Sequence, residues 1–332
     1  MSKPFSNAGW KSLLARHETV LLFVLMAEIL FFNSMGRNFG TAANIANIVR
    51  QSVEIGLLAL VMTPIILTAG IDLSVGSLMG LCAVVFGMLW KDAGVAPWLA
   101  AVGAVATGAL GGSVNAALIT RLGLPPLIVT LGTFSLFRGL AEAFTGGTKA
   151  YTNFPDSFLA LGNSFALGVP IQAWIFIGVA VAIWLLVHRT TFGRAFRAIG
   201  FAPEGARYAG IPVERRLALA YTLAGAVAGL AAVIFVSRVT EARANAGIGY
   251  ELAAITAVVL GGTSIFGGVG TVHGTLLGVA AVAVLANGLS RILSIMSVSR
   301  ELSGMLTGAL LLLALAAGAF GKWISARRAK SG

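Results

Sequence analysis

The chain has 332 residues, of which 58% are hydrophobic and only 11% are charged, whereas soluble globular domains carry about 25% charged residues. So little polar surface excludes a water-soluble protein and predicts an all-α, polytopic membrane protein. The net charge of +11 does not indicate a nucleic-acid-binding protein, because no basic surface domain with interleaved aromatic residues is present, and the positive-inside rule accounts for it.

Ten apolar segments are predicted to cross the membrane, because a helix needs about 20 mostly apolar residues to span the hydrocarbon core. They cover residues 19–32, 52–68, 73–90, 97–120, 125–144, 171–187, 217–236, 252–260, 269–292 and 302–320. The eighth is short and breaks at the glycine-rich run Gly261–Gly268, so nine or eleven spans would follow if residues 252–266 were re-entrant. Residues 36–51 are predicted as an interfacial segment outside the membrane, and residues 146–169 as a long outer loop.

The distribution of positive charge predicts the orientation. With ten spans, both termini lie on the same side of the membrane, together with residues 188–216. That side carries the larger share of the Lys and Arg residues, so we expect cytoplasmic N- and C-termini. The predicted organisation is a permease domain over residues 19–321, between a tail of residues 1–18 and a basic tail of residues 322–332.

Residues 188–216 form the longest water-facing segment with a dense positive charge. Within it, residues 202–208 are predicted to form one short helix. Pro203 has the fixed φ of a first helical turn, Glu204 complements the helix dipole, and Gly210 ends the helix. A short helix held between two spans predicts a rigid protrusion to which another protein binds. The alternative is an ordinary positive-inside loop.

Asp72 follows a predicted span, where an unpaired carboxylate is costly and therefore a candidate functional group. It also follows Gly70 and precedes a helical segment, so it can instead cap exposed backbone N–H groups, which is the interpretation we favour. Ser74 and Ser77 either line a pathway or donate hydrogen bonds back to carbonyls.

Other polar groups in the spans give weaker signals. Arg138 and Glu142 lie four residues apart on one helix face, which favours an ion pair over a proton relay that also uses Glu28. The three histidines are dispersed without metal-ligand spacing, so no metal site is expected. Motifs of an intramembrane enzyme are absent from the sequence, and no catalytic residue is assigned.

The glycine cluster Gly261–Gly270 lacks the Gly-Lys-Ser/Thr ending of a phosphate-binding loop. Unwound backbone is tolerated at membrane depth only where protein or a water-filled cavity covers it. We therefore expect this cluster in the bundle interior, near a translocation pathway that Asn287 also faces.

Three motifs resemble the permease subunits of bacterial monosaccharide ABC importers of the ribose, xylose, galactose, rhamnose and autoinducer-2 type. They are Ala69–Ser77, Pro125–Thr133 and Gly249–Ser264, and the resemblance extends from about residue 20 to residue 318. It implies a fold similar to that of vitamin B12 importer permeases. It also implies a location in the bacterial inner membrane and three partners: ATPase subunits that carry the ATP and Mg²⁺, a periplasmic sugar-binding protein and a second permease. This chain is expected to hold no cofactor.

The resemblance also assigns candidate site residues. Residues 198–211 are similar to the family's coupling segment, Ala-x-Gly-x-Asn-x-x-Ala-Ala-x-x-Ser-Gly-Ile, but Ala202, Gly205 and Ala209 depart from it. The residues expected to couple to the ATPase are Gly200, Pro203, Glu204, Gly205, Ala206, Arg207, Tyr208, Gly210 and Ile211. Those expected at the pathway or at helix breaks are Gly70, Asp72, Ser74, Gly76, Ser77, Thr130, Gly132, Thr133, Gly261, Gly262, Thr263, Ser264 and Asn287.

The sequence therefore predicts the permease subunit of an ATP-driven sugar importer, in which motion of the 188–216 segment reorients the bundle. Gly205 and Ala206 are expected to allow close approach of the ATPase, with Arg207 and Tyr208 as anchors. The alternatives are a branched-chain amino-acid ABC permease, a proton-coupled secondary transporter and a purely structural subunit. In the general character of its sequence, the chain most resembles rhamnose-type and autoinducer-2-type permeases.

Overall fold

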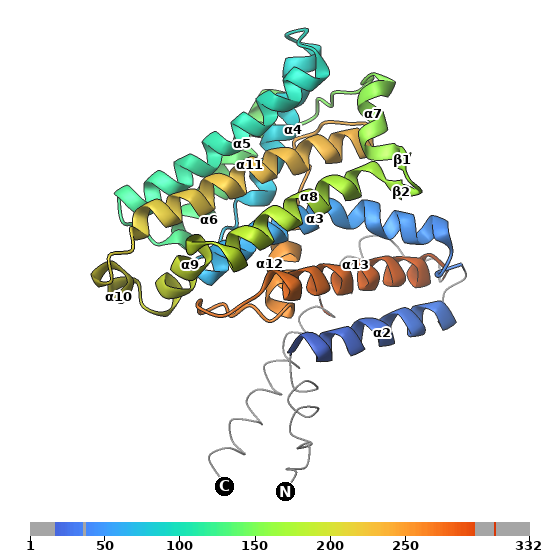
Figure 1. Cartoon of the computed structure of the whole chain (residues 1–332). Helices are drawn as coiled ribbons and strands as arrows, with labels where there is room; N and C mark the ends of the chain where they lie inside the picture. The colour runs from blue at the N-terminus through green and yellow to red at the C-terminus, as the bar shows by residue number, and fades with distance from the viewer. Residues whose placement is uncertain (1–16, 36–37, 296–308, 310–332) are drawn as a thin grey trace, which may run out of the picture.

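The computed structural model describes residues 17–35, 38–295 and 309 of the chain, and these residues fold almost entirely into α-helices (Figure 1). The elements are α2 (His17–Met35), α3 (Ala42–Leu67), α4 (Val75–Lys91), α5 (Pro97–Arg121), α6 (Pro126–Thr145), α7 (Asp156–Asn163), β1 (Phe165–Ala166), β2 (Val169–Pro170), α8 (Ile171–Arg189), α9 (Thr191–Phe201), α10 (Pro203–Tyr208), α11 (Val213–Val239), α12 (Tyr250–Leu260) and α13 (Val272–Ile295). The predicted all-α bundle is confirmed.

Among the described residues, seven helices are long and apolar enough to cross a membrane: α2, α3, α5, α6, α8, α11 and α13. They correspond to seven of the predicted spans. The predicted third and eighth spans are the shorter apolar helices α4 and α12. The predicted tenth span, residues 302–320, lies outside the described residues apart from residue 309.

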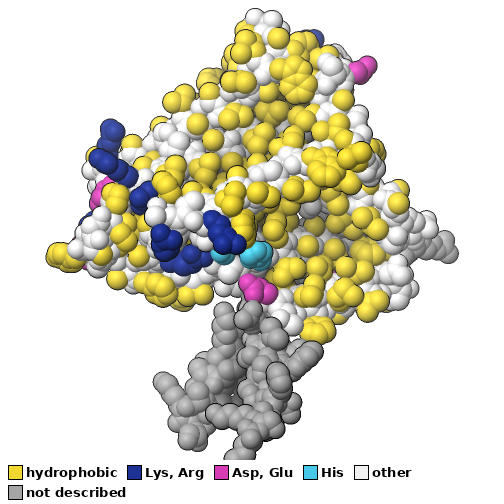
Figure 2. All heavy atoms as spheres, in the orientation of Figure 1, with side chains coloured by type: hydrophobic (Ala, Val, Ile, Leu, Met, Phe, Trp, Pro, Cys, Tyr) yellow, Lys and Arg dark blue, Asp and Glu magenta, His cyan; other side chains and the backbone are white. Residues whose placement is uncertain are grey.

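The outer surface of the bundle is apolar. Leu110, Ile128 and Leu131 are each more than half exposed, and Figure 2 shows hydrophobic side chains over the flanks of the long helices. Water does not solvate such a surface favourably, whereas lipid tails do. The bundle is therefore a membrane protein.

Small residues bring the backbones of α5 and α11 into direct contact. A Cβ placed on Gly108 would lie 2.2 Å from the carbonyl oxygen of Gly225, and one on Gly112 would lie 2.3 Å from that of Tyr221. Helices in lipid gain little from burying apolar surface against each other, so close backbone approach of this kind supplies the packing. The glycine-rich composition of the fourth predicted span thus has a structural role.

Helix α3 corrects the prediction for residues 36–51. The helix begins at Ala42, after the N-cap Thr41, whose hydroxyl accepts a hydrogen bond from Asn44 N at 3.4 Å. Its 26 residues exceed the roughly 20 that a span needs, and the helix continues through Pro64 to Leu67. The second half of the predicted interfacial segment is therefore the first part of a long helix.

Two connecting segments are more ordered than predicted. Residues 146–169 contain α7 and strand β1, which pairs with β2 in an antiparallel hairpin with Phe165 opposite Pro170. Residues 188–216 contain α9 in addition to the predicted short helix. Thr190 begins α9, and its hydroxyl accepts a hydrogen bond from Phe192 N at 3.1 Å. The α7 hairpin and the α9–α10 segment lie at opposite ends of the bundle (Figure 1).

Candidate functional site

Helix α10 has the limits that its sequence predicts. It begins with Pro203 in its first turn, and Gly210 follows it with a φ of +78° that favours glycine. Ala206 is only 4% exposed and packs against Ile199 of α9 and Val213 of α11. The expectation that Ala206 allows close approach of a partner is therefore wrong, because its methyl group faces inward and holds the segment together.

The exposed surface of the α9–α10 segment combines aromatic and basic groups. Tyr208 is 92% exposed and Phe201 is 70% exposed. Figure 2 shows Lys and Arg side chains gathered on this side of the molecule. Arg207 forms ion pairs within this segment: its Nη2 lies 2.8 Å from Glu214 Oε1 of α11, and its Nη1 pairs with Glu204 of α10. The hydrogen bonds that Arg207 donates to Glu214, together with the negative charge of Glu204, raise the pKa of Arg207 above its usual value.

Gly200 joins this segment to the interior of the bundle. A Cβ placed on Gly200 would lie 2.0 Å from the carbonyl oxygen of Leu67, at the end of α3, and 2.4 Å from Gly268 N. Gly268 N in turn donates a hydrogen bond of 2.9 Å to Leu67 O. Gly267 has a φ of +83°, and a Cβ placed on it would lie 2.8 Å from Ala69 N. The coupling segment, the first motif and the glycine-rich run therefore meet in backbone contact.

The first two motifs meet through a chain of buried polar side chains. Asp72 Oδ1 accepts hydrogen bonds from Ser74 N at 2.8 Å and from Ser74 Oγ at 2.7 Å. Asn115 Nδ2 of α5 donates to Ser74 Oγ at 2.8 Å, and Thr133 Oγ1 of α6 donates to Asn115 Oδ1 at 2.7 Å. All four side chains are buried. Asn115 was not predicted as a site residue, although an asparagine within a Gly- and Ala-rich span is itself a signal.

The remaining polar residues of these two motifs bond to backbone. Thr130 Oγ1 donates to Ile71 O at 3.2 Å, and Ser77 Oγ donates to Ser74 O at 2.9 Å. Asp72 precedes Ser74, the N-cap of α4, so its carboxylate organises the turn that leads into this helix. Gly132 is exposed, and no atom lies near the position of a Cβ on it, so it faces away from the polar chain.

The third motif contacts the first along one face of α4. A Cβ on Gly76 would lie 2.0 Å from Glu251 Oε2 and 2.6 Å from Gly247 O. One turn later, a Cβ on Gly80 would lie 2.7 Å from Arg138 Nη1. Ala242 pairs with Tyr151 at the other end of the same face. Residues 240–249 therefore run inward along α4.

Arg138 holds this inward-running segment. Its Nη1 donates to Ala246 O at 3.1 Å and also to Ala244 O. Across the part of the chain that the structure describes, no ion pair joins Arg138 to Glu142, so the predicted ion pair is wrong. The physical reason is that carbonyls of a non-helical segment find no water within the membrane, and the guanidinium is the donor within reach.

The glycine-rich run forms the turn between α12 and α13. Gly261 packs against Gly274 of α13: a Cβ placed on Gly261 would lie 2.3 Å from the carbonyl oxygen of Gly274. The next residue, Gly262, has a φ of +91°. Ser264 N closes the turn by donating to Val269 O at 2.8 Å, whereas the buried Thr263 Oγ1 finds no hydrogen-bond partner among the residues that the structure describes. The base of this turn lies in the bundle interior as expected.

The tip of this turn and Asn287 do not join the interior cluster. Phe266 is 90% exposed beside the α9 end of the bundle. Asn287 Oδ1 accepts a hydrogen bond from Asn44 Nδ2 at 3.1 Å, which connects α13 to the beginning of α3. The structure thus brings together the residues around Asp72, Thr133, Gly200 and Gly268, and places Asn287 in a separate contact. Within the described ranges, no three His, Cys, Asp or Glu side chains gather as a metal site would require.

A bundle with an apolar exterior, a buried polar chain and an exposed helical segment in contact with that interior defines a membrane transport protein of the permease class. The chain belongs to the family described as branched-chain amino acid transport system / permease component, whose model matches residues 44–315. The resemblance to sugar-type and autoinducer-2-type ABC permeases, inferred from three motifs, is confirmed.

Several relatives are autoinducer 2 import system permease proteins LsrD. The protein of Yersinia pseudotuberculosis serotype O:3 (strain YPIII) is 37% identical over 314 residues, which cover 93% of this chain and 91% of the relative. That of Yersinia enterocolitica serotype O:8 / biotype 1B is 41% identical over 264 residues, with 78% of each chain covered. No solved structure matches the chain, so the expected similarity to vitamin B12 importer permeases stays a prediction.

Proposed function

We propose that this chain is the permease subunit of an ATP-driven importer that carries a monosaccharide or an autoinducer-2-like solute across the bacterial inner membrane. The LsrD relatives support the solute class. ATP and Mg²⁺ bind to partner ATPase subunits, a periplasmic binding protein delivers the solute to the α7 end, and a second permease completes the pathway. Both termini then lie in the cytoplasm together with the α9–α10 segment.

One observation carries the mechanical part of this proposal: Gly200 of α9 touches Leu67 and Gly268 through backbone atoms. Backbone contacts of this kind leave no flexible side chain to absorb a displacement. An ATPase that binds the exposed face of α9 and α10 therefore moves the end of α3 and the α12–α13 turn with it. Those two elements adjoin the buried chain around Asp72, so the displacement reaches the centre of the bundle.

The proton-coupled alternative keeps its candidate carboxylates Asp72, Glu28 and Glu142. Only a relay through Arg138 loses support, because this guanidinium donates to the backbone carbonyls of residues 244 and 246. The amino-acid alternative keeps support from the description of the family itself. Leucine therefore belongs among the solutes that an uptake experiment compares.

The test is uptake by the complex that copurifies with the full-length chain, reconstituted in lipid vesicles together with its binding protein. Labelled ribose, rhamnose, autoinducer 2 and leucine serve as probes. We expect uptake of ribose, rhamnose or autoinducer 2 with ATP and none with a pH gradient alone. Uptake by the purified chain under a pH gradient without nucleotide would contradict the proposal, and ATP-driven uptake of leucine alone would reassign the solute class.

A further inference from the structure

A cavity of about 250 Å³ lies between α3, α11, α12 and α13, away from the polar chain around Asp72. We propose that it is a binding site for one molecule of a small, neutral, polyhydroxylated solute on its way through the bundle. This inference rests on the proposed transport function and adds a location for the solute. The volume corresponds to that of about eight liquid water molecules, which suits a small solute rather than a peptide or a lipid tail.

One wall of the cavity is polar. Gln51 and Ser52 come from α3, Arg238 from the last turn of α11, and Tyr250 from the first residue of α12. Ser52 Oγ donates to Val49 O at 3.0 Å, so its lone pairs are available to accept a hydrogen bond. Amide, hydroxyl, guanidinium and phenol groups together offer donors and acceptors but no carboxylate. Sugar-like hydroxyl groups, which both donate and accept, match this set.

The opposite wall is apolar and is formed mainly by α13. Ile55 of α3 faces the cavity together with Ala283 of α13 and its neighbours. Small-molecule sites commonly combine a mostly apolar lining with a few polar groups that fix the orientation of the ligand. The C–H face of a sugar ring is suited to such a wall.

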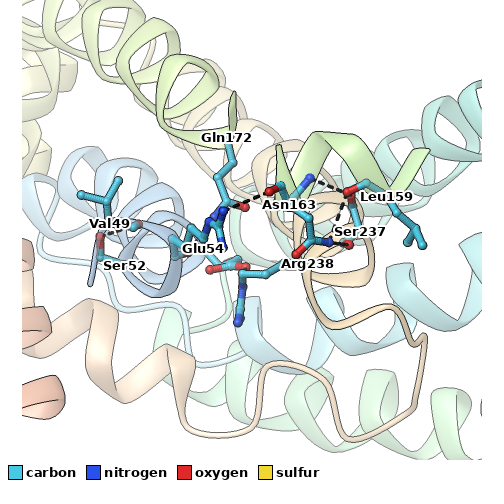
Figure 3. A network of polar contacts seen from close by, with 10 residues as sticks. Val49, Ser52, Glu54, Leu159, Asn163, Gln172, Ser237 and Arg238 are labelled. Atoms are coloured by element: carbon cyan, nitrogen blue, oxygen red, sulfur yellow. Dashed lines mark hydrogen bonds and ion pairs between the residues drawn. The ribbon is translucent and has the colours of Figure 1, made fainter. Parts of the chain in front are cut away.

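Arg238 is held in place before any solute arrives. Its Nε lies 2.7 Å from Glu54 Oε1, and Glu54 is fully buried whereas the Arg238 side chain is 18% exposed (Figure 3). The preceding residue, Ser237, is tied to α7: its Oγ accepts from Gly162 N at 2.8 Å, and its carbonyl accepts from Asn163 Nδ2 at 2.8 Å. Because Glu54 balances the guanidinium charge, the wall favours a neutral solute over an anion.

Glu54 supplies a second observation that points to a ligand or water. Its Oε2 is buried and has no hydrogen-bond partner among the described residues. Buried polar atoms are nearly always hydrogen-bonded. Glu54 does not itself line the cavity, but its partner Arg238 does, so this carboxylate lies directly behind the polar wall.

The cavity adjoins the elements that the coupling segment moves. A Cβ on Gly278 of α13 would lie 2.0 Å from the carbonyl oxygen of Ala257 in α12, so the two helices are in backbone contact beside the cavity. Their connecting turn is the one that touches Gly200. A displacement of that turn therefore changes the spacing of two walls of the cavity, which connects solute release to the motion of α9 and α10.

The first test fills the cavity without removing a hydrogen bond. Ala283→Phe places a ring in it, and Ala280→Phe on the same helix is the matched control, because Ala280 is also half-buried but does not line the cavity. In vesicles that contain the complete complex, we expect ATP-driven uptake of the transported probe to fall at least tenfold in the first variant. The control should stay within about twofold of the wild type.

The second test measures binding directly. Cys82 is the only cysteine of the chain and is buried, so Cys82→Ala provides a background for a single cysteine introduced by Ala283→Cys. Ribose, rhamnose or autoinducer 2 should slow its reaction with a water-soluble thiol reagent. Ser164→Cys, in the exposed segment after α7, should react at the same rate with and without solute.

The two tests separate failure of the site from failure of the function. If the wild-type complex takes up none of the three probes with ATP, the proposed function is wrong, and so is the proposed solute site. If the wild type transports a probe while Ala283→Phe transports it equally fast, or if that probe does not protect Ala283→Cys, the function stands and the cavity is not the solute site.

Discussion

Buried polar residues in the first two motifs form one connected chain, and each member depends on the next. Asn115 is central to it, because its amide joins Ser74 at the start of α4 to Thr133 of α6. A buried polar group that loses its partner costs about 1–3 kcal/mol. The chain therefore fixes how α4, α5 and α6 meet, in a region where apolar burial alone stabilises little.

Replacement of this amide tests the chain directly. Asn115→Leu removes the donor to Ser74 Oγ and the acceptor of Thr133 Oγ1, while both hydroxyls keep another hydrogen bond. We therefore expect a loss of about 1–3 kcal/mol in the free energy of unfolding for the two hydrogen bonds together. Thermal denaturation of the purified protein in detergent measures it. Thr107→Ala is the control on the same helix, since Thr107 is half-buried and its Oγ1 donates to Gly103 O of the same helix. Equal melting temperatures for the two variants would contradict the account.

Gly200 is the residue on which the proposed coupling depends most. Gly200→Ala puts a methyl group about 2 Å from Leu67 O, and a backbone atom cannot move aside cheaply. Gly178→Ala on α8 is its control, because no described atom lies within 4 Å of a new Cβ there. We expect the first to lower ATP-driven uptake at least tenfold and the second to leave it within about twofold. Normal uptake by Gly200→Ala would show that the close contact is dispensable.

Among the elements, the non-helical residues 240–249 are the least expected part of the fold. They run along the glycine face of α4 and present their carbonyls to Arg138. A segment without helical hydrogen bonds is tolerated within a membrane protein only when other groups satisfy its backbone. The arginine and the glycines of α4 together make this path possible.

Loss of the guanidinium should loosen this segment. We expect Arg138→Met to raise amide hydrogen exchange of residues 240–249 at least tenfold, because the carbonyls of Ala244 and Ala246 lose their donor. Glu142→Gln is the control, since Glu142 makes no ion pair with Arg138. Equal exchange in both variants, measured by mass spectrometry of the purified protein, would show that Arg138 does not hold the segment.

Several elements could be predicted from the sequence because their signals are local. Pro203 and Gly210 predict both ends of α10, and Gly261–Gly268 predicts the end of α12. Helix α9 was missed because the polar composition around it resembles a loop, although Thr190 is an ordinary N-cap. Seven of the spans follow from apolar length alone, as the bilayer requires.

The site residues were only partly predictable, because local sequence spacing does not show which residues distant in the chain become hydrogen-bond partners. Asp72 and Thr133 stand in recognisable motifs, yet Asn115, which connects them, stands in none. Arg138 illustrates the same limit: its spacing from Glu142 suits an ion pair, but a distant backbone segment takes its hydrogen bonds. Ala206 faces inward for a comparable reason, since α9 and α11 enclose it.

For the molecule as a whole, the proposed function is that of a bundle that partner ATPase subunits drive from the α9–α10 end. In this proposal, the partner binds the exposed aromatic residues Tyr208 and Phe201. The buried Ala206 and the ion pairs of Arg207 hold the α9–α10 segment in one conformation. The backbone contact at Gly200 then carries the displacement to α3 and to the α12–α13 turn. The polar chain and the proposed solute cavity both adjoin these elements.

The most direct measurement is the initial rate of ATP-driven solute uptake by the complete complex carrying Tyr208→Asp. Tyr208 is almost fully exposed, so its replacement leaves the folded chain intact while placing a charge where the ATPase is expected to bind. The account predicts at least a tenfold fall in uptake, with less ATPase copurifying or with ATP hydrolysed without transport. Uptake at the wild-type rate, with ATPase subunits still required, would contradict it.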